Sequence, residues 1–97
     1  MRIKFYGALK HEIGIDEVEI EGQVETLREA VNRIVEKLGD RASKALLSEK
    51  GDLRTGLLVL INGTPASLMG GLDAKLRRGD EVVLDRIEMI EVEGGGL

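Results

Sequence analysis

Residues 26–38 read TLREAVNRIVEKL, and the spacing of their apolar side chains predicts an amphipathic helix. These side chains recur every three or four positions and fall on one stripe: Leu27, Ala30, Val31, Ile34, Val35 and Leu38. Thr26 and Glu29 form a capping box, which satisfies free N–H groups at a helix start. Gly39 suits the left-handed position just after a helix end. We therefore expect the main helix here, with one face on a core.

Two strands are expected before this helix. Ile3 and Phe5 alternate with Arg2, Lys4 and Tyr6, which indicates a strand with one buried face, and Gly7 ends that strand. Residues 17–21 alternate strictly, with Val18 and Ile20 facing inward. The residues between the two strands are interpreted as a connector, which is long for a simple hairpin.

After the helix, the pattern predicts a shorter second helix over residues 42–47 and then three more strands. Residues 57–61 (LLVLI) are continuously apolar, as in a central strand buried on both faces. Asn62-Gly63 supplies a tight turn, Pro65 allows only a short or edge strand, and residues 81–84 form the last strand. The order predicts an α+β fold of the β-grasp type: a mixed sheet of four to five strands crossed by one main helix, plus a short second helix.

Composition narrows the possible functions. The chain has 97 residues, which fits one domain, and it has no cysteine, which excludes disulfides, thiolate metal sites and a cysteine nucleophile. Its net charge of −4 argues against nucleic-acid binding. No apolar run is long enough for a membrane span, and the start lacks a signal-peptide pattern. We expect a cytoplasmic protein with no membrane or nucleic-acid partner.

No group of residues forms a catalytic motif. His11 stands alone in the expected connector, and a solitary surface histidine is usually inert. Acidic residues 17, 19 and 21 share a strand face, where a solvated surface is a simpler interpretation than a metal site. Basic residues 75, 77 and 78 form a small cluster before a turn, either solvated or paired with a partner. We expect no enzyme activity, no bound cofactor and no metal.

Five segments, in order along the chain, resemble the MoaD/ThiS family of ubiquitin-like sulfur carriers. They are residues 3–10 (IKFYGALK), 24–30 (VETLREA), 59–63 (VLING), 71–76 (GLDAKL) and 79–82 (GDEV), followed by the terminal glycines Gly94, Gly95 and Gly96. Each segment is weak alone, but their order and spacing along nearly the whole chain resemble the family, in particular the small subunit of molybdopterin synthase.

The resemblance implies a carrier that is a cosubstrate and not a catalyst. A partner enzyme would use ATP to adenylate the C-terminal carboxylate of Gly96 or Gly95, and a thiocarboxylate would follow. The sulfur would pass to the large subunit of molybdopterin synthase, in molybdenum or tungsten cofactor synthesis, or to another acceptor enzyme. Glycine suits this role because a tail without Cβ atoms can enter a narrow channel and leaves its carbonyl accessible.

The C-terminal segment departs from the family pattern in two ways. Residues 85–93 form a longer, acidic arm without proline, and Leu97 follows Gly96. Leu97 is either removed by processing, an addition from cloning, or a sign that the chain is no active carrier. We expect a domain over residues 1–93 and a flexible glycine-rich tail over 94–97. Met89, Ile90 and Val92 in the arm are expected to contact partners, unless a bulge or an edge buries them.

Two other functions are compatible with these residues. One is a small protein modifier that joins its tail to lysines of other proteins. The other is a β-grasp interaction module whose tail is never activated and whose Leu97 is genuine.

Overall fold

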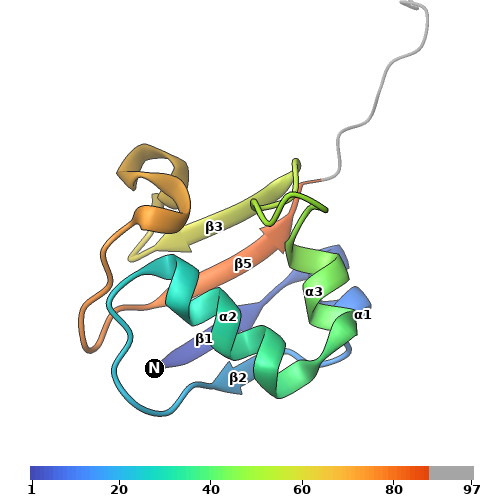
Figure 1. Ribbon diagram of the computed structural model, residues 1–97, viewed down its shortest axis with the longest axis horizontal. Coiled ribbons are helices and arrows are strands. Elements are labelled where there is room, and N and C mark those ends of the chain that lie inside the picture. The colour runs from blue at the N-terminus through green and yellow to red at the C-terminus, as the bar shows by residue number, and fades with distance from the viewer. Residues whose placement is uncertain (88–97) are drawn as a thin grey trace, which may run out of the picture.

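The computed structural model describes residues 1–87 and shows one five-stranded sheet (Figure 1). The strands are β1 (Arg2–Phe5), β2 (Glu17–Glu19), β3 (Leu57–Ile61), β4 (Thr64–Pro65) and β5 (Val82–Arg86), in the spatial order β2-β1-β5-β3-β4. β1 and β5 are parallel, and the other neighbouring pairs are antiparallel. The mixed sheet confirms the predicted α+β, β-grasp architecture.

Within residues 1–87, three helices accompany the sheet: α1 (Gly7–Ile13), α2 (Leu27–Leu38) and α3 (Asp40–Leu46). The longest, α2, crosses in front of β1 and β5 in Figure 1. Two short 3-10 turns, η1 (Ala66–Met69) and η2 (Gly71–Asp73), connect β4 to the last strand. Among residues 1–87, no helix is long and apolar enough to cross a membrane.

The core lies between α2 and the sheet and is almost entirely aliphatic. Leu27 and Ile34 of α2 belong to the same buried cluster as Ile3, Phe5 and Leu84 of the central strands. Phe5 is the one aromatic residue among the fully buried side chains. Burial of this apolar surface is the main force that holds the helix on the sheet.

The helix start agrees with the predicted capping box, with one difference. Thr26 is the N-cap, and its hydroxyl accepts a hydrogen bond from the backbone N–H of Glu29 at 3.3 Å. The carboxylate of Glu29 accepts from the backbone N–H of Glu25 at 2.7 Å, one residue before the predicted partner. Gly39 ends the helix with a φ of +80°, and α3 starts at the next residue, which confirms the predicted second helix.

The interpretation of residues 8–16 as a simple connector is wrong. Residues 7–13 form α1, whose buried face carries Leu9 and Ile13, spaced four residues apart. Gly14 closes the helix in the left-handed conformation at φ +92°. The helix explains why the segment between β1 and β2 is too long for a hairpin.

The prediction that β3 is buried on both faces is also wrong. Val59 and Ile61 are buried, but Leu57, Leu58 and Leu60 are only partly so. Leu57 packs against the core, whereas Leu58 and Leu60 point to the other side of the sheet. The second strand is shorter than predicted, since β2 ends at Glu19, although Ile20 remains buried.

Candidate docking surface on the open sheet face

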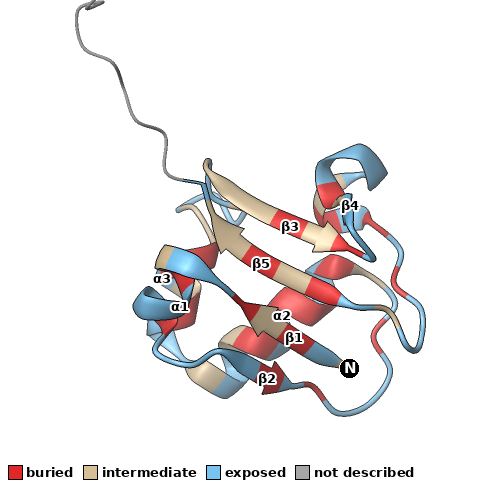
Figure 2. Ribbon diagram, turned by 180° about the vertical axis from the view of Figure 1, so that it is seen from behind, coloured by how far each residue is buried: buried red, intermediate tan, exposed pale blue. Residues whose placement is uncertain are grey.

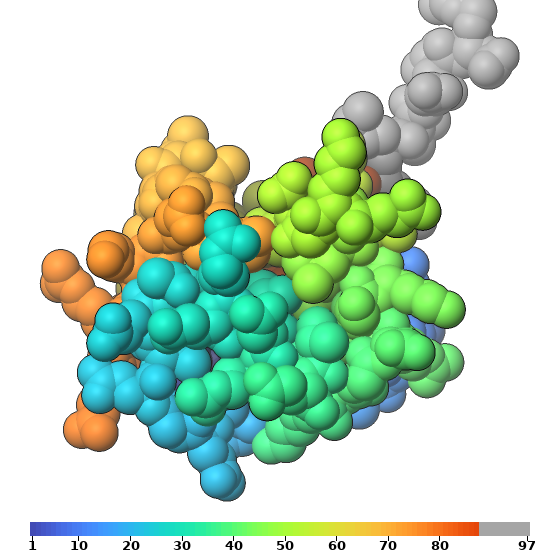
Figure 3. Space-filling view, viewed as in Figure 1, coloured from blue at the N-terminus to red at the C-terminus, as the bar shows by residue number. Residues whose placement is uncertain are grey.

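The sheet has one face under the helices and one face that no helix covers among residues 1–87. Figure 2 views the sheet from the uncovered side, with the strands in front of α2. Side chains alternate between the two faces of a strand, so the neighbours of buried Phe5, Val59 and Leu84 point outward. Figure 3 shows the opposite face, where the side chains of the helices close over the sheet.

Apolar side chains line the uncovered face. The register places Leu60 beside Val83 of β5, and Leu58 lies two residues along on the same face, opposite Asp85. By the same alternation, Tyr6 and Ile87 extend this face beyond the ends of β1 and β5, and they are 48% and 50% exposed. We call the surface formed by Tyr6, Leu58, Leu60, Val83 and Ile87 the open face.

Charged residues lie beside these apolar ones. Lys4 of β1 is the cross-strand neighbour of Val83 of β5. On the same face, Asp85 lies between Val83 and Ile87, the residue that follows β5. An apolar centre beside charged groups is typical of a protein-binding surface. A separate hollow of about 500 Å³ is lined by polar residues: Ser48, Glu49, Lys50, Arg54 and Thr55. It lacks the apolar lining of a small-molecule site.

The open face ends where the described chain leaves the sheet. The backbone N–H of Ile87 donates to the carbonyl of Gly56 at 2.7 Å, which continues the β3–β5 ladder by one hydrogen bond. On the side of β5 away from β3, the Asp85 carboxylate lies close to Gly7, the first residue of α1. A Cβ at Gly7 would lie 2.5 Å from Asp85 Oδ1 and would displace that carboxylate, and the φ of +57° at Gly7 also favours glycine.

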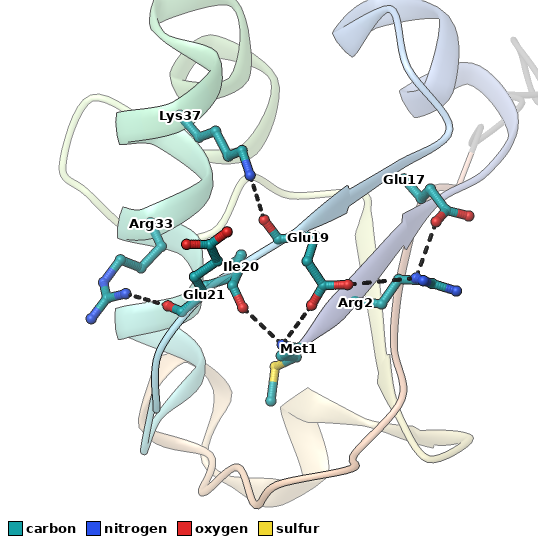
Figure 4. Close-up of polar contacts among 8 residues, drawn as sticks. All are labelled: Met1, Arg2, Glu17, Glu19, Ile20, Glu21, Arg33 and Lys37. Carbon is teal, nitrogen blue, oxygen red and sulfur yellow. Dashed lines mark hydrogen bonds and ion pairs between the residues drawn. The ribbon is translucent and has the colours of Figure 1, made fainter.

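The edge strand β2 is protected from strand pairing by side chains of α2 (Figure 4). Lys37 Nζ donates to the carbonyl of Glu19 at 2.7 Å, and Arg33 Nη1 donates to the carbonyl of Glu21 at 2.8 Å. Lys37 therefore occupies the last carbonyl of β2, which another strand would use, and Arg33 occupies a carbonyl two residues beyond the strand. A partner is therefore better accommodated on the open face than at this edge.

The titratable groups with displaced pKa values have structural partners. A hydrogen bond from the amino group of Met1 lowers the pKa of Glu19, and Arg2 and Lys37 add to this effect. A hydrogen bond from the Asn62 side chain, followed by one from the backbone of Arg77, lowers the pKa of Asp80. Among the described residues no cluster of His, Asp or Glu could hold a metal ion. The surface offers contact area and no evident reactive group.

The structure does not describe the site residues that the sequence predicted. Met89, Ile90, Val92, Gly94, Gly95 and Gly96, and the domain boundary at residue 93, fall outside the described residues. The isolated signals lie apart from the open face: His11 is exposed on α1, and Lys75, Arg77 and Arg78 are exposed before β5. Sequence reasoning missed the open face itself. The residues that form it in β3, Leu58 and Leu60, alternate with the buried Val59 and Ile61. Because all four are apolar, the sequence shows a continuous apolar run and not two different faces.

A mixed β-grasp sheet crossed by one main helix defines a ubiquitin-like fold. The model of the family described as Urm1 (Ubiquitin related modifier) matches residues 2–90, and the chain belongs to this family. The resemblance to ubiquitin-like sulfur carriers seen in the sequence is thereby confirmed. A search of curated proteins finds no match.

Solved structures with the same fold are similar over almost the entire chain. SAMP1 from Haloferax volcanii has a TM-score of 0.79 at 22% identity, with 94% of this chain and 98% of that chain covered. CysO in the Amycolatopsis orientalis BexX/CysO complex has a TM-score of 0.75 at 20% identity, with 93% and 98% covered. Sulfolobus solfataricus Urm1 has a TM-score of 0.67 at 22% identity, with 90% and 100% covered. At these identities the likeness establishes the fold.

Proposed function

We propose that this chain is a sulfur carrier whose C-terminal glycine is activated by a partner enzyme. The tail carboxylate would attack the α-phosphate of ATP, forming an acyl-adenylate and releasing pyrophosphate. Sulfide supplied by the partner system would then attack the acyl carbon, break its bond to the phosphate oxygen, release AMP and leave a thiocarboxylate. The acyl group would belong to Gly96 after loss of Leu97, or to Gly95.

The observation that supports this proposal is the continuity of the open face with the root of the tail. Ile87 belongs to the open face, and it is also the last described residue before the glycine-rich end. An enzyme docked on Leu58, Leu60 and Val83 would therefore have the chain end within reach. The carboxylate of the tail is the nucleophile only in the adenylation step; the sulfur nucleophile of the second step, any base and any metal would come from the partner system.

Two partners follow from this scheme. The first is an ATP-dependent adenylating enzyme of the ubiquitin-activating type; the similar protein CysO has been crystallised in a complex with BexX, so a protein of this fold does bind a partner. The second is a sulfur acceptor, for which the large subunit of molybdopterin synthase is the first candidate and cofactor synthesis the pathway. Glu88, Glu91 and Glu93, which follow β5 in the sequence, would suit a basic cleft on either partner, since Arg86 belongs to β5 and is already paired with Glu12.

The decisive experiment is ATP–pyrophosphate exchange by the adenylating enzyme of the same cells. A chain ending at Gly96 should support exchange, and a chain lacking Gly94 to Gly96 should fold equally well and support none. A matched control replaces the same three glycines by serine, which keeps the length of the tail and tests whether glycine itself is required. Normal exchange by the chain without glycines would refute the proposal.

The second candidate function is a protein modifier that forms isopeptide bonds with lysines. The description of the family as a ubiquitin-related modifier favours it, as does the full name of SAMP1, small archaeal modifier protein 1. Both functions begin with the same activated carboxylate, so exchange does not separate them. A remnant of this tail on lysines of other proteins, found by mass spectrometry of digested cell extract, would establish the modifier function.

A further inference from the structure

Arg86 occupies the point where β5 ends, and its side chain contacts two helices. The register places it opposite Leu57, on the side of the sheet that carries the helices. Its Nε lies 2.6 Å from Oε2 of Glu12 on α1, and its Nη2 donates to the carbonyl of Ala45 on α3 at 3.3 Å. The side chain of Arg86 is 21% exposed and that of Glu12 is 45% exposed, so only the guanidinium side of the ion pair is shielded from water.

The end of β5 needs this support because it has a strand on only one side. The pairing of β1 with β5 ends at Leu84, where the backbone N–H of Tyr6 donates to the Leu84 carbonyl. From Asp85 onward, β3 alone continues the ladder, up to the bond between Ile87 and Gly56. A two-stranded end frays more readily than a strand flanked on both sides. Arg86 anchors the side that β1 leaves free.

The anchor also completes the C-terminal cap of α3. The last four carbonyls of a helix have no partner within it. In α3, Ser43 O accepts from Leu47 N, while Arg54 binds Lys44 O with its side chain and Leu46 O with its backbone N–H. Ala45 O is bound by Arg86. The guanidinium of Arg86 is thus tied to an element that is itself fixed by Arg54.

We propose that Arg86 is a positioning residue that fixes, through Glu12 and Ala45, the place and direction in which the chain leaves the sheet. This inference rests on the proposed function, because a fixed origin matters only if a partner must receive the tail. Docking would depend on the open face, whereas delivery of the carboxylate to ATP would depend on the clamped end of β5. Misplacement of a reacting group costs rate even when binding is retained.

The test compares Arg86→Gln with Arg86→Lys and with the charge-reversed pair Glu12→Arg/Arg86→Glu. Amide hydrogen exchange measures the effect of the clamp, by which we mean the contacts of Arg86 with Glu12 and Ala45. In Arg86→Gln, the exchange rate of the Ile87 amide should rise about tenfold, while that of the Leu84 amide stays unchanged. Arg86→Lys should keep part of the protection, and the charge-reversed pair should restore more of it than Arg86→Glu alone.

The second readout is the kinetics of ATP–pyrophosphate exchange with chains ending at Gly96. For Arg86→Gln we expect kcat to fall about tenfold, while the KM of the enzyme for the carrier chain changes little. Docking on the open face is intact in this variant, but the tail carboxylate is placed less accurately against ATP. Equal loss of protection at Leu84 and Ile87, or unchanged Ile87 exchange and kcat, would overturn the positioning role. If the unaltered chain supports no exchange at all, the proposed function fails, and the amide of Ile87 still decides whether the clamp exists.

Discussion

Asn62 and Asp80 are joined side chain to side chain: Asn62 Nδ2 donates to Asp80 Oδ1 at 2.9 Å, across 18 positions of sequence. Asn62 Oδ1 accepts in return from the backbone N–H of Glu81 at 2.9 Å, and Asp80 Oδ2 accepts from the backbone N–H of Arg77 at 2.7 Å. The β3–β4 turn is thereby tied to the start of β5. The contact gives a structural reason for two segments that resembled a family, VLING and GDEV.

Replacing Asn62 should separate the contribution of its side chain from that of its backbone conformation. Asn62→Gly removes two hydrogen bonds but tolerates the φ of +51°, and it should lower the free energy of unfolding by about 1–2 kcal/mol. Asn62→Ala should cost about 1 kcal/mol more, because a left-handed conformation is strained for alanine. Urea unfolding of both variants measures the difference, and equal losses would contradict this division.

Asp80 predicts a pH dependence of stability. Its pKa is lowered in the folded chain by the Asn62 side chain and the Arg77 N–H, so the ionised form is stabilised by folding. That stabilisation is present above the unfolded pKa of an aspartate, about 3.9, and is lost as the pH falls through the lower folded pKa. Asp80→Asn should therefore be less stable than the unaltered chain at pH 7, and the gap should narrow below about pH 4. A constant gap in urea unfolding across this range would argue against it.

The core can be tested with two leucines of opposite environment. Leu84 is fully buried in β5, and Leu84→Ala should lower the free energy of unfolding by about 2–5 kcal/mol through lost contacts and a cavity. Leu68, in η1, is 78% exposed, and Leu68→Ala should change stability by less than about 0.5 kcal/mol. Comparable losses in the two variants would contradict the assigned packing.

The open face can be tested by adding a charge where a partner would dock. Leu58→Lys places an ammonium group opposite Asp85, an arrangement that a sheet tolerates, so the fold should persist. Burying that charge under a partner is costly, so in ATP–pyrophosphate exchange the KM of the enzyme for the carrier chain should rise about tenfold or more. Leu68→Lys, the same change at an exposed leucine of η1 that is not part of the open face, is the matched control and should leave this KM unaltered.

Much of the fold could be predicted because several local signals agree. The stripe over residues 27–38, the Thr26 cap and Gly39 all indicate the same helix, and the structure contains it. Alternation identified β1, with Ile3 and Phe5 buried, since one face of that strand is polar enough to show the period. The turn at Asn62-Gly63 follows from the positive φ angles that both residues adopt.

The parts that were missed depend on tertiary context. α1 carries only two buried residues, Leu9 and Ile13, which is too few to display a helical period in a short segment. In β3, five consecutive apolar residues cannot show whether the second face is covered by helices or kept open for a partner. The contact between Arg86 and Glu12 joins residues 74 positions apart, and no local pattern indicates it.

The most direct test of the proposed carrier function is the intact mass of the protein isolated from its native cells. We predict a chain that ends at Gly96 and, in part of the material, carries the mass increase of one oxygen exchanged for sulfur. The exchange should disappear when the adenylating enzyme is deleted. Native protein that retains Leu97 throughout and never contains the additional sulfur would contradict activation of the glycine end.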